Sequence, residues 1–182
     1  MKKLLAVSAI IAGCVGAWAQ GSVNFSNLPF GANALVTDGL GNKLGTAYLA
    51  QLYAGAAESS LAPVGAAVAF RNNSAGVATG LFSGGERVTS LPVAGGGVFQ
   101  VRAWEAALGN SYDVALAAGN GLKVGKSSVF AIGTLGDSLA QPPGTPVNLT
   151  GLTSFSLVAI PEPSTVALGL LGAVSLLAFR RK

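Results

Sequence analysis

The sequence contains no histidine, a single cysteine and few charged residues, which make up 10% of its 182 positions. Without histidine the chain cannot form a histidine-dependent catalytic triad, a histidine general base or a histidine metal site. The sparse charge argues against a coiled coil or a long solvated helix. A hydrophobic content of 51% argues against intrinsic disorder. The length predicts one domain with enough chain to bury a core.

The formal charge of +4 comes from the two ends of the chain. Lys2 and Lys3 lie at the start, residues 180–182 are all basic, and Glu162 is the one acid near the C-terminus. Between residues 20 and 160, six basic and six acidic residues cancel. Nucleic-acid binding needs a basic surface, so the composition does not support a nucleic-acid partner.

The N-terminus has the pattern of a secretory signal peptide. An apolar run, residues 4–15, follows the two lysines, and Ala17 and Ala19 are the small residues that a signal peptidase recognises. Residues 1–19 are therefore predicted to be a signal peptide cleaved before Gln20. Cleavage there removes Cys14, and with it any disulfide, thiol nucleophile or cysteine metal site.

Two alternatives for the N-terminus remain. Ile11-Ala12-Gly13-Cys14 resembles a bacterial lipobox, in which Cys14 would carry a lipid after an earlier cleavage. This leaves a short apolar segment, near the lower limit for signal peptides. The other alternative is a buried N-terminal helix.

The C-terminus combines a chain break, an apolar segment and a basic end. Pro161, Glu162 and Pro163 precede sixteen uncharged residues, 164–179, which are followed by Arg180, Arg181 and Lys182. Sixteen helical residues span about 24 Å, somewhat less than the hydrocarbon core of about 30 Å, and terminal arginines can snorkel. The pattern predicts a transmembrane helix with the basic residues as its cytoplasmic stop. A core helix is the alternative, but it would not be apolar on all sides.

This arrangement resembles the PEP-CTERM sorting signal of bacteria. The resemblance covers residues 161–182 and depends on the order of Pro161–Pro163, the apolar span and Arg180–Arg181. It implies export, recognition by an exosortase-like membrane enzyme near the motif, and association with exopolysaccharide or biofilm material. It also implies an inner-membrane intermediate before the cell surface or extracellular space. The short apolar span favours removal of the tail over permanent anchoring.

Residues 20–160 show short apolar stretches separated by glycine and polar turns. This spacing predicts an all-β domain, an antiparallel sandwich of the immunoglobulin-like or jelly-roll type. The expected strands are 22–25, 34–37, 46–53, 66–70, 77–82, 87–93, 98–104, 128–132 and 153–159. The clearest turns are residues 38–42, 72–76 and 95–97, which are rich in glycine and asparagine.

One segment predicts a short helix. Ser111 can cap residues 112–118, which contain alanine and leucine, and Gly119 follows where a helix favours a left-handed residue. The helix is expected to be a connection that packs on the sandwich.

No catalytic set is recognisable in the middle region. Its six acids are isolated from one another in the sequence: Asp38, Glu58, Glu86, Glu105, Asp113 and Asp137. A glycosidase needs two carboxylates at a fixed separation, and a serine hydrolase of the common type needs a G-x-S-x-G elbow, which is absent. No calcium loop or dinucleotide motif is present either. We expect no enzyme activity, no cofactor and no resident metal.

Trp104 is the best candidate for ligand binding. Alternation along residues 98–104 places Phe99, Val101 and Ala103 on the core side and Gln100, Arg102 and Trp104 on the other. An exposed ring flanked by hydrogen-bonding side chains would suit a sugar. The favoured alternative is that a bulge or the following helix covers Trp104.

The middle region also resembles secreted proteins of unassigned role that combine a Gly21–Phe25 start with a PEP-CTERM tail. Residues 100–105 and 125–130 add to this resemblance, which brings no active site. The leading hypothesis is an exported structural or adhesive protein of the cell surface or matrix, next to extracellular polysaccharide. A carbohydrate-binding module is the second hypothesis, and a carboxylate-dependent hydrolase the third.

Overall fold

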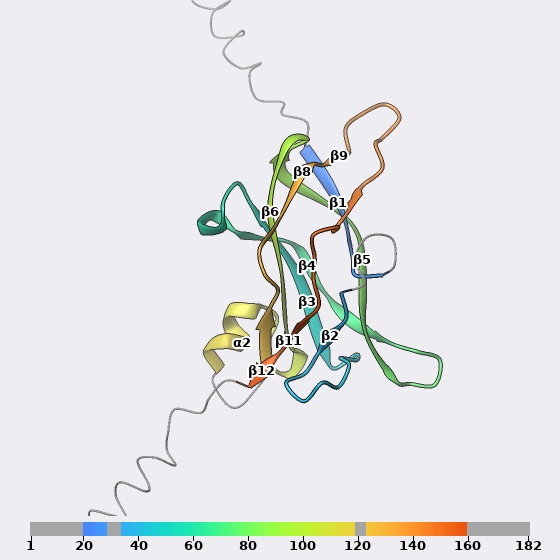
Figure 1. Ribbon diagram of the computed structural model, residues 1–182, viewed down its shortest axis with the longest axis vertical. Coiled ribbons are helices and arrows are strands. Elements are labelled where there is room, and N and C mark those ends of the chain that lie inside the picture. Colours follow the sequence, from blue (N-terminus) through green and yellow to red (C-terminus); the bar gives the residue numbers. More distant parts are fainter. Residues whose placement is uncertain (1–19, 29–33, 119–122, 160–182) are drawn as a thin grey trace, which may run out of the picture.

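The computed structural model describes residues 20–28, 34–118 and 123–159. The strands are β1 (Gln20–Ser26), β2 (Val36–Thr37), β3 (Tyr48–Gly55), β4 (Ala62–Asn72), β5 (Ala78–Pro92), β6 (Ala94–Glu105), β7 (Lys123–Lys126), β8 (Phe130–Thr134), β9 (Gly136–Asp137), β10 (Val147–Asn148), β11 (Phe155–Ser156) and β12 (Val158–Ala159). The helical segments are η1 (Glu58–Ser60), η2 (Ala106–Leu108) and α2 (Tyr112–Ala118). The prediction of an all-β, mainly antiparallel fold with one short helix is confirmed (Figure 1).

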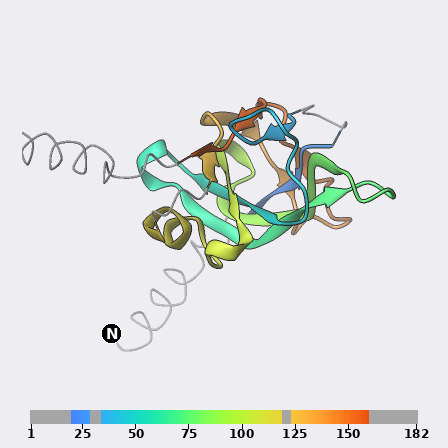
Figure 2. The ribbon, with the colours of Figure 1, turned by 90° about the horizontal axis from the view of Figure 1, so that it is seen from below.

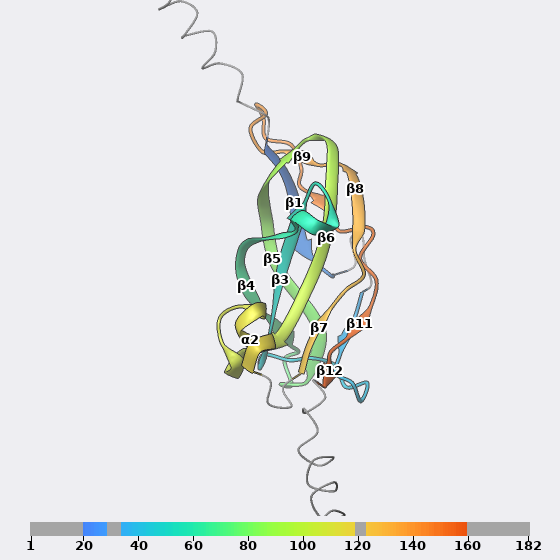
Figure 3. The same ribbon diagram turned by 90° about the vertical axis from the view of Figure 1, so that its left-hand side faces the viewer.

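Most strands join one large sheet in the order β10-β1-β5-β4-β3-β6-β7-β12, with β8 added to β6 and β9 to β1. β2 and β11 form a separate parallel pair. The ladders β3–β4 and β3–β6 are both antiparallel; β3–β6 runs without a break along β3, whereas β3–β4 has a register shift between Ala50 and Leu52. Seen from its edge, the molecule places β4 and β5 on one side and β8 and β11 on the other (Figure 3).

β5 changes its partner along its length, and this bends the sheet. Its first part pairs with β4 through Phe70 and Phe82, whereas its second part pairs with β1. The change occurs at Gly84 and Gly85, where the register against β1 shifts and Gly85 has a φ of +69°. A side chain at that φ would be strained, so glycine permits the bend.

The main core lies inside this curved sheet. It contains residues from nearly every strand, among them Phe25, Phe82 and Phe99, which are fully buried. Phe25 and Phe82 have ring centroids 4.7 Å apart. Leu149, Leu152 and Leu157 close the core from the C-terminal part of the domain.

The expected strands agree with the structure except where pairing between residues distant in the sequence sets the bounds of a strand. The segments 77–82 and 87–93 were expected to be two strands because glycines lie between them, but they form the single bent strand β5. The segment 153–159 contains two short strands, β11 and β12. β7, β9 and β10 were not expected as strands; each has four residues or fewer, which leaves little pattern in the sequence.

The helix prediction is confirmed in its bounds and its cap. α2 spans Tyr112–Ala118, and the Ser111 hydroxyl accepts a hydrogen bond from the Val114 N–H at 3.3 Å. Figure 2 shows the helix on the outside of the sheet. Tyr112 and Ala115 are its buried residues, and they pack on the face of β6 opposite the main core.

Candidate functional site

Gln100, Arg102 and Trp104 lie together on the outer face of β6, as the alternation of the strand predicts. Phe99, Val101 and Ala103 point into the main core and are fully buried. On the outer side, Trp104 belongs to a second, smaller cluster with Tyr53, Tyr112, Ala115 and Val124. The two sides of β6 are therefore assigned correctly from the sequence, and the remaining question is what covers the outer side.

The hypothesis that Trp104 is an exposed platform is wrong, because its side chain has no exposed surface. Tyr112, the first residue of α2, meets the indole edge to face, with ring centroids 6.3 Å apart and planes at 77°. The Trp104 Nε1–H donates to the Gly109 carbonyl oxygen at 2.8 Å. The segment that follows β6 thus covers the indole ring and satisfies its donor, as the alternative reading expected.

Arg102 is the centre of the polar part of this face. Its guanidinium carbon lies 3.9 Å from the centroid of the Tyr53 ring and 5.2 Å from that of Tyr112. Its Nε–H donates to Gln100 Oε1 at 2.9 Å. Contacts of a guanidinium with aromatic faces are attractive, and more so when water is partly excluded. We call Tyr53, Gln100, Arg102 and Tyr112 the arginine cluster.

Asp113 adds a weak ion pair to the arginine cluster. One carboxylate oxygen lies 3.8 Å from Arg102 Nη1, and the Asp113 side chain is 77% exposed. At this exposure solvent screens the pair, so its contribution to stability is small. The aromatic contacts and the Gln100 hydrogen bond therefore hold Arg102 in place more than the carboxylate does.

Gln100 and Ser127 connect the arginine cluster to the sheet. Gln100 is nearly buried, and its Nε2 donates to the Ser127 carbonyl oxygen at 3.1 Å. The Ser127 hydroxyl accepts from the Val101 N–H at 3.0 Å and donates to the Ser128 carbonyl oxygen at 2.8 Å. These polar groups bind protein atoms, so a sugar would have to displace internal hydrogen bonds to use them.

Burial raises the pKa of both tyrosines in the arginine cluster above its ordinary value of about 10. The nearby Asp113 carboxylate raises each pKa further, while the Arg102 guanidinium opposes the shift. Both phenols are therefore neutral at physiological pH, and Arg102 faces neutral aromatic rings. The sequence offered no signal for Tyr53, because its position beside Arg102 depends on the register of β3 against β6.

Asp38 and Asp137 shape turns, and Asp113 pairs with Arg102. Asp38 Oδ1 accepts from the N–H groups of Leu40 and Asn42, both at 2.8 Å. Asp137 Oδ1 accepts from the N–H groups of Leu139 and Ala140. Among residues 20–28, 34–118 and 123–159, no three histidine, cysteine, aspartate or glutamate side chains gather as a metal site.

The predicted sorting residues flank the described domain. Gln20, expected to follow the signal-peptide cleavage, is the first residue of β1, and its carbonyl oxygen accepts from the Ser138 hydroxyl at 3.0 Å. The other predicted sorting residues lie outside the described residues: Cys14, Ala17, Ala19, Pro161–Pro163, the segment 164–179 and Arg180–Lys182. Within the part of the chain that the structure describes, no helix is long and apolar enough to cross a membrane.

Comparison with known families decides the nature of the C-terminus. Residues 159–182 match the PEP-CTERM protein-sorting motif. The chain carries a PEP-CTERM sorting signal. The motif supports an exported protein that an exosortase-type membrane enzyme processes. No curated protein and no solved structure matches the chain, so the PEP-CTERM motif is the finding that bears on function.

Proposed function

We propose that this PEP-CTERM protein is a non-enzymatic structural or adhesive component of the cell surface or extracellular matrix. The observation that carries the proposal is the sorting motif at residues 159–182, attached to a folded β domain. The polar side chains of the arginine cluster support it, because they bind one another and the backbone.

The proposed route begins with cleavage by signal peptidase before Gln20. Residues 164–179 then hold the chain in the inner membrane as a helix, with Arg180, Arg181 and Lys182 on the cytoplasmic side by the positive-inside rule. The exosortase-type enzyme recognises Pro161-Glu162-Pro163 on the outer side and removes the tail. The domain then leaves the membrane and joins the matrix.

The exported region has no net charge, which suits a protein that packs against its neighbours in an extracellular matrix. Between residues 20 and 160 the six basic and six acidic residues cancel, so neighbouring domains meet without net repulsion. Extracellular polysaccharide is the expected surrounding of the protein. Binding of a sugar to Trp104 is not part of the proposal, because the ring is buried beneath α2.

The test compares two variants of the tail in the producing cells. Deletion of residues 161–182 removes both the motif and the apolar segment, and we expect the domain to lose its normal location. Replacement of Pro161, Glu162 and Pro163 by alanine keeps the apolar segment, and we expect an unprocessed chain that stays with the membrane. Fractionation followed by immunoblotting measures both. Unchanged location in both variants, together with an alanine variant of the same size as the unaltered protein, would contradict the sorting proposal.

A further inference from the structure

The outward side of α2 is almost entirely apolar. Two of its seven residues face the sheet, and the other five are exposed: Asp113, Val114, Leu116, Ala117 and Ala118. Val114 is 55% exposed and Leu116 is 48% exposed. A surface helix usually carries several charged or polar side chains on its solvent side. The one charged side chain here is Asp113, which pairs with Arg102, so α2 lacks the solvated face of an ordinary surface helix.

The short helical segment before α2 extends this apolar surface. η2 contacts α2, and two of its three residues are exposed alanines. We call the exposed apolar residues of the two segments the helical patch: Ala106, Ala107, Val114, Leu116, Ala117 and Ala118. An exposed apolar surface of this kind is typical of a site that contacts another protein or a membrane.

The helical patch lies beside the point where the chain leaves the domain. Val124 of β7 packs in the cluster beneath α2, and the same residue pairs with Val158 of β12. β12 ends at Ala159, directly before the tail. Figure 1 shows α2 and β12 at the same end of the molecule, whereas β9 and the turn after it lie at the other end.

The connection between β12 and the proposed membrane helix is short. It consists of the four residues 160–163. An extended chain spans at most about 3.6 Å per residue, so this connection reaches at most about 14 Å. The head-group layer on each side of the hydrocarbon core is itself about 5–7 Å thick. When residues 164–179 span the membrane, the end of the domain that carries the helical patch is therefore held at the lipid head groups.

We propose that the helical patch docks on the lipid surface while the tail is attached. A helix in this position lies in the plane of the membrane, with its apolar side chains among the head groups and the outer part of the acyl chains. Docking holds residues 160–163 along the membrane surface, where a membrane enzyme can reach them. The patch is small, so removal of the tail releases the domain. The inference deepens the proposed function and rests on its membrane-anchored intermediate.

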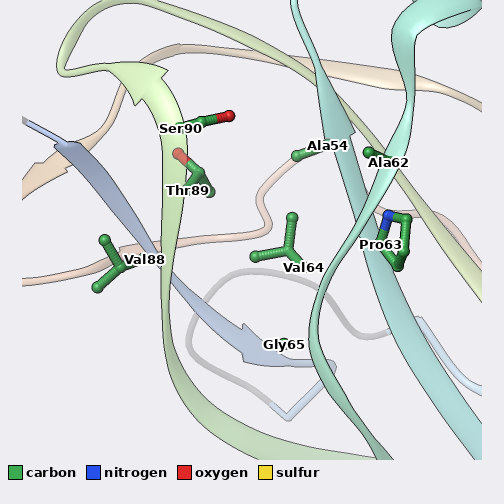
Figure 4. A pocket seen from close by; sticks show the side chains of 8 residues that line it. All are labelled: Ala54, Ala62, Pro63, Val64, Gly65, Val88, Thr89 and Ser90. Carbon is green, nitrogen blue, oxygen red and sulfur yellow. The ribbon is translucent and has the colours of Figure 1, made fainter.

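A second exposed apolar surface serves as a comparison. Val88 is 45% exposed, close to the value for Leu116, and borders the pocket between β4 and β5 that Figure 4 shows. Ala54, in the wall of the same pocket, pairs with Phe99 of β6, five residues before Trp104, which α2 covers. Five residues of a strand span about 17 Å. The surface around Val88 is therefore well separated from the helical patch.

Quenching of a fluorophore by lipids tests the proposal. The chain, with Cys14→Ser, is produced in cells without an exosortase-type enzyme, so that it keeps its tail, and is purified from their membranes. It is placed in vesicles of phosphatidylethanolamine and phosphatidylglycerol, with or without a nitroxide group on the acyl chains. A fluorophore is attached at Ala117→Cys, in the helical patch. We expect the nitroxide lipids to quench most of its fluorescence. Leu139→Cys, at a residue that is 60% exposed in the turn after β9, is the control and should keep its fluorescence.

Acidic variants distinguish docking from the effect of the short connection alone. Val114→Asp with Leu116→Asp places charge on the helical patch and should abolish the quenching at Ala117→Cys. Val88→Asp with Leu139→Asp adds the same charge at similarly exposed residues elsewhere and should preserve it. Equal quenching in both acidic variants, or equal quenching at Ala117→Cys and Leu139→Cys, would overturn the proposal. So would a fluorophore that is shielded from water equally with and without nitroxide lipids, because a protein would then cover the patch.

Flotation of the vesicles separates this inference from the proposed function. A chain that floats with the vesicles but fails the quenching test overturns the inference alone and leaves the sorting proposal intact. A chain that does not float with the vesicles contradicts the membrane-anchored intermediate, and the inference with it.

Discussion

The two faces of β6 are buried by different kinds of contact. On the inner face, Phe99, Val101 and Ala103 enter a core that many strands share. On the outer face, Gln100, Arg102 and Trp104 are covered by one seven-residue helix and by the rings of two tyrosines. The inner face depends on the shape of many apolar side chains, and the outer face depends on a few hydrogen bonds and aromatic contacts.

This difference explains why the best sequence candidate for binding is not a binding site. Trp104 lies on the less apolar face of its strand, which suggests exposure, but the segment after β6 returns to cover it through Gly109 and Tyr112. The outer face is thus a second, smaller core with a polar border. We expect substitutions on the inner face to lower the free energy of unfolding more than substitutions on the outer face.

The largest effect is expected from Phe99→Ala on the inner face. The ring is fully buried and stacks on Phe130, with centroids 6.1 Å apart. Its removal leaves a cavity and should cost about 3–5 kcal/mol of unfolding free energy, a large part of the total for a domain. Urea unfolding of the purified protein measures it. Val98→Ala, at a half-buried neighbour, is the control; equal losses for both would contradict the assignment of the inner face.

A smaller loss is expected from Arg102→Met on the outer face. The substitution removes the guanidinium from Tyr53 and leaves Gln100 Oε1 without its donor, which should cost about 2 kcal/mol. Lys126→Met is the matched control, because Lys126 is the exposed residue opposite Arg102 on β7 and should change stability by less than about 0.5 kcal/mol. If both variants unfold at the same urea concentration, Arg102 does not organise this face.

The smallest effect is a loss of stability at high pH. Tyr53 and Tyr112 have a raised pKa in the folded protein, so they keep their protons there while the unfolded chain loses them above a pH of about 10. Unfolding then releases protons, and the stability present below this pH falls as the pH rises through the folded pKa values. Urea unfolding at increasing pH measures the slope. Replacing both tyrosines by phenylalanine should flatten it, and an unchanged slope would show that other groups are responsible.

The parts of the fold predicted from the sequence are those set by local chemistry. Ser111 caps the start of α2 because helix ends need particular residues, and β6 shows its two faces because side chains alternate along a strand. The sorting motif is also local, since its three parts follow one another in the sequence.

The parts that the sequence did not predict depend on contacts between distant residues. The segments 77–82 and 87–93 were expected to be separate strands, but β1 pairs with residues on both sides of Gly84, and the glycines form a bend within β5. Tyr53 meets Arg102 only through the register of β3 against β6. The cover over Trp104 likewise depends on how α2 packs, so the ring's burial could not be read from its position in the strand.

Mass spectrometry of the two ends of the protein recovered outside the cells tests the central claim most directly. If the chain is exported and sorted through its PEP-CTERM tail, the recovered protein begins at Gln20 and ends at or near Pro161–Pro163, without the apolar segment and the basic end. Recovery of the protein only inside the cells, with residues 1–19 and 164–182 still attached, would contradict the account.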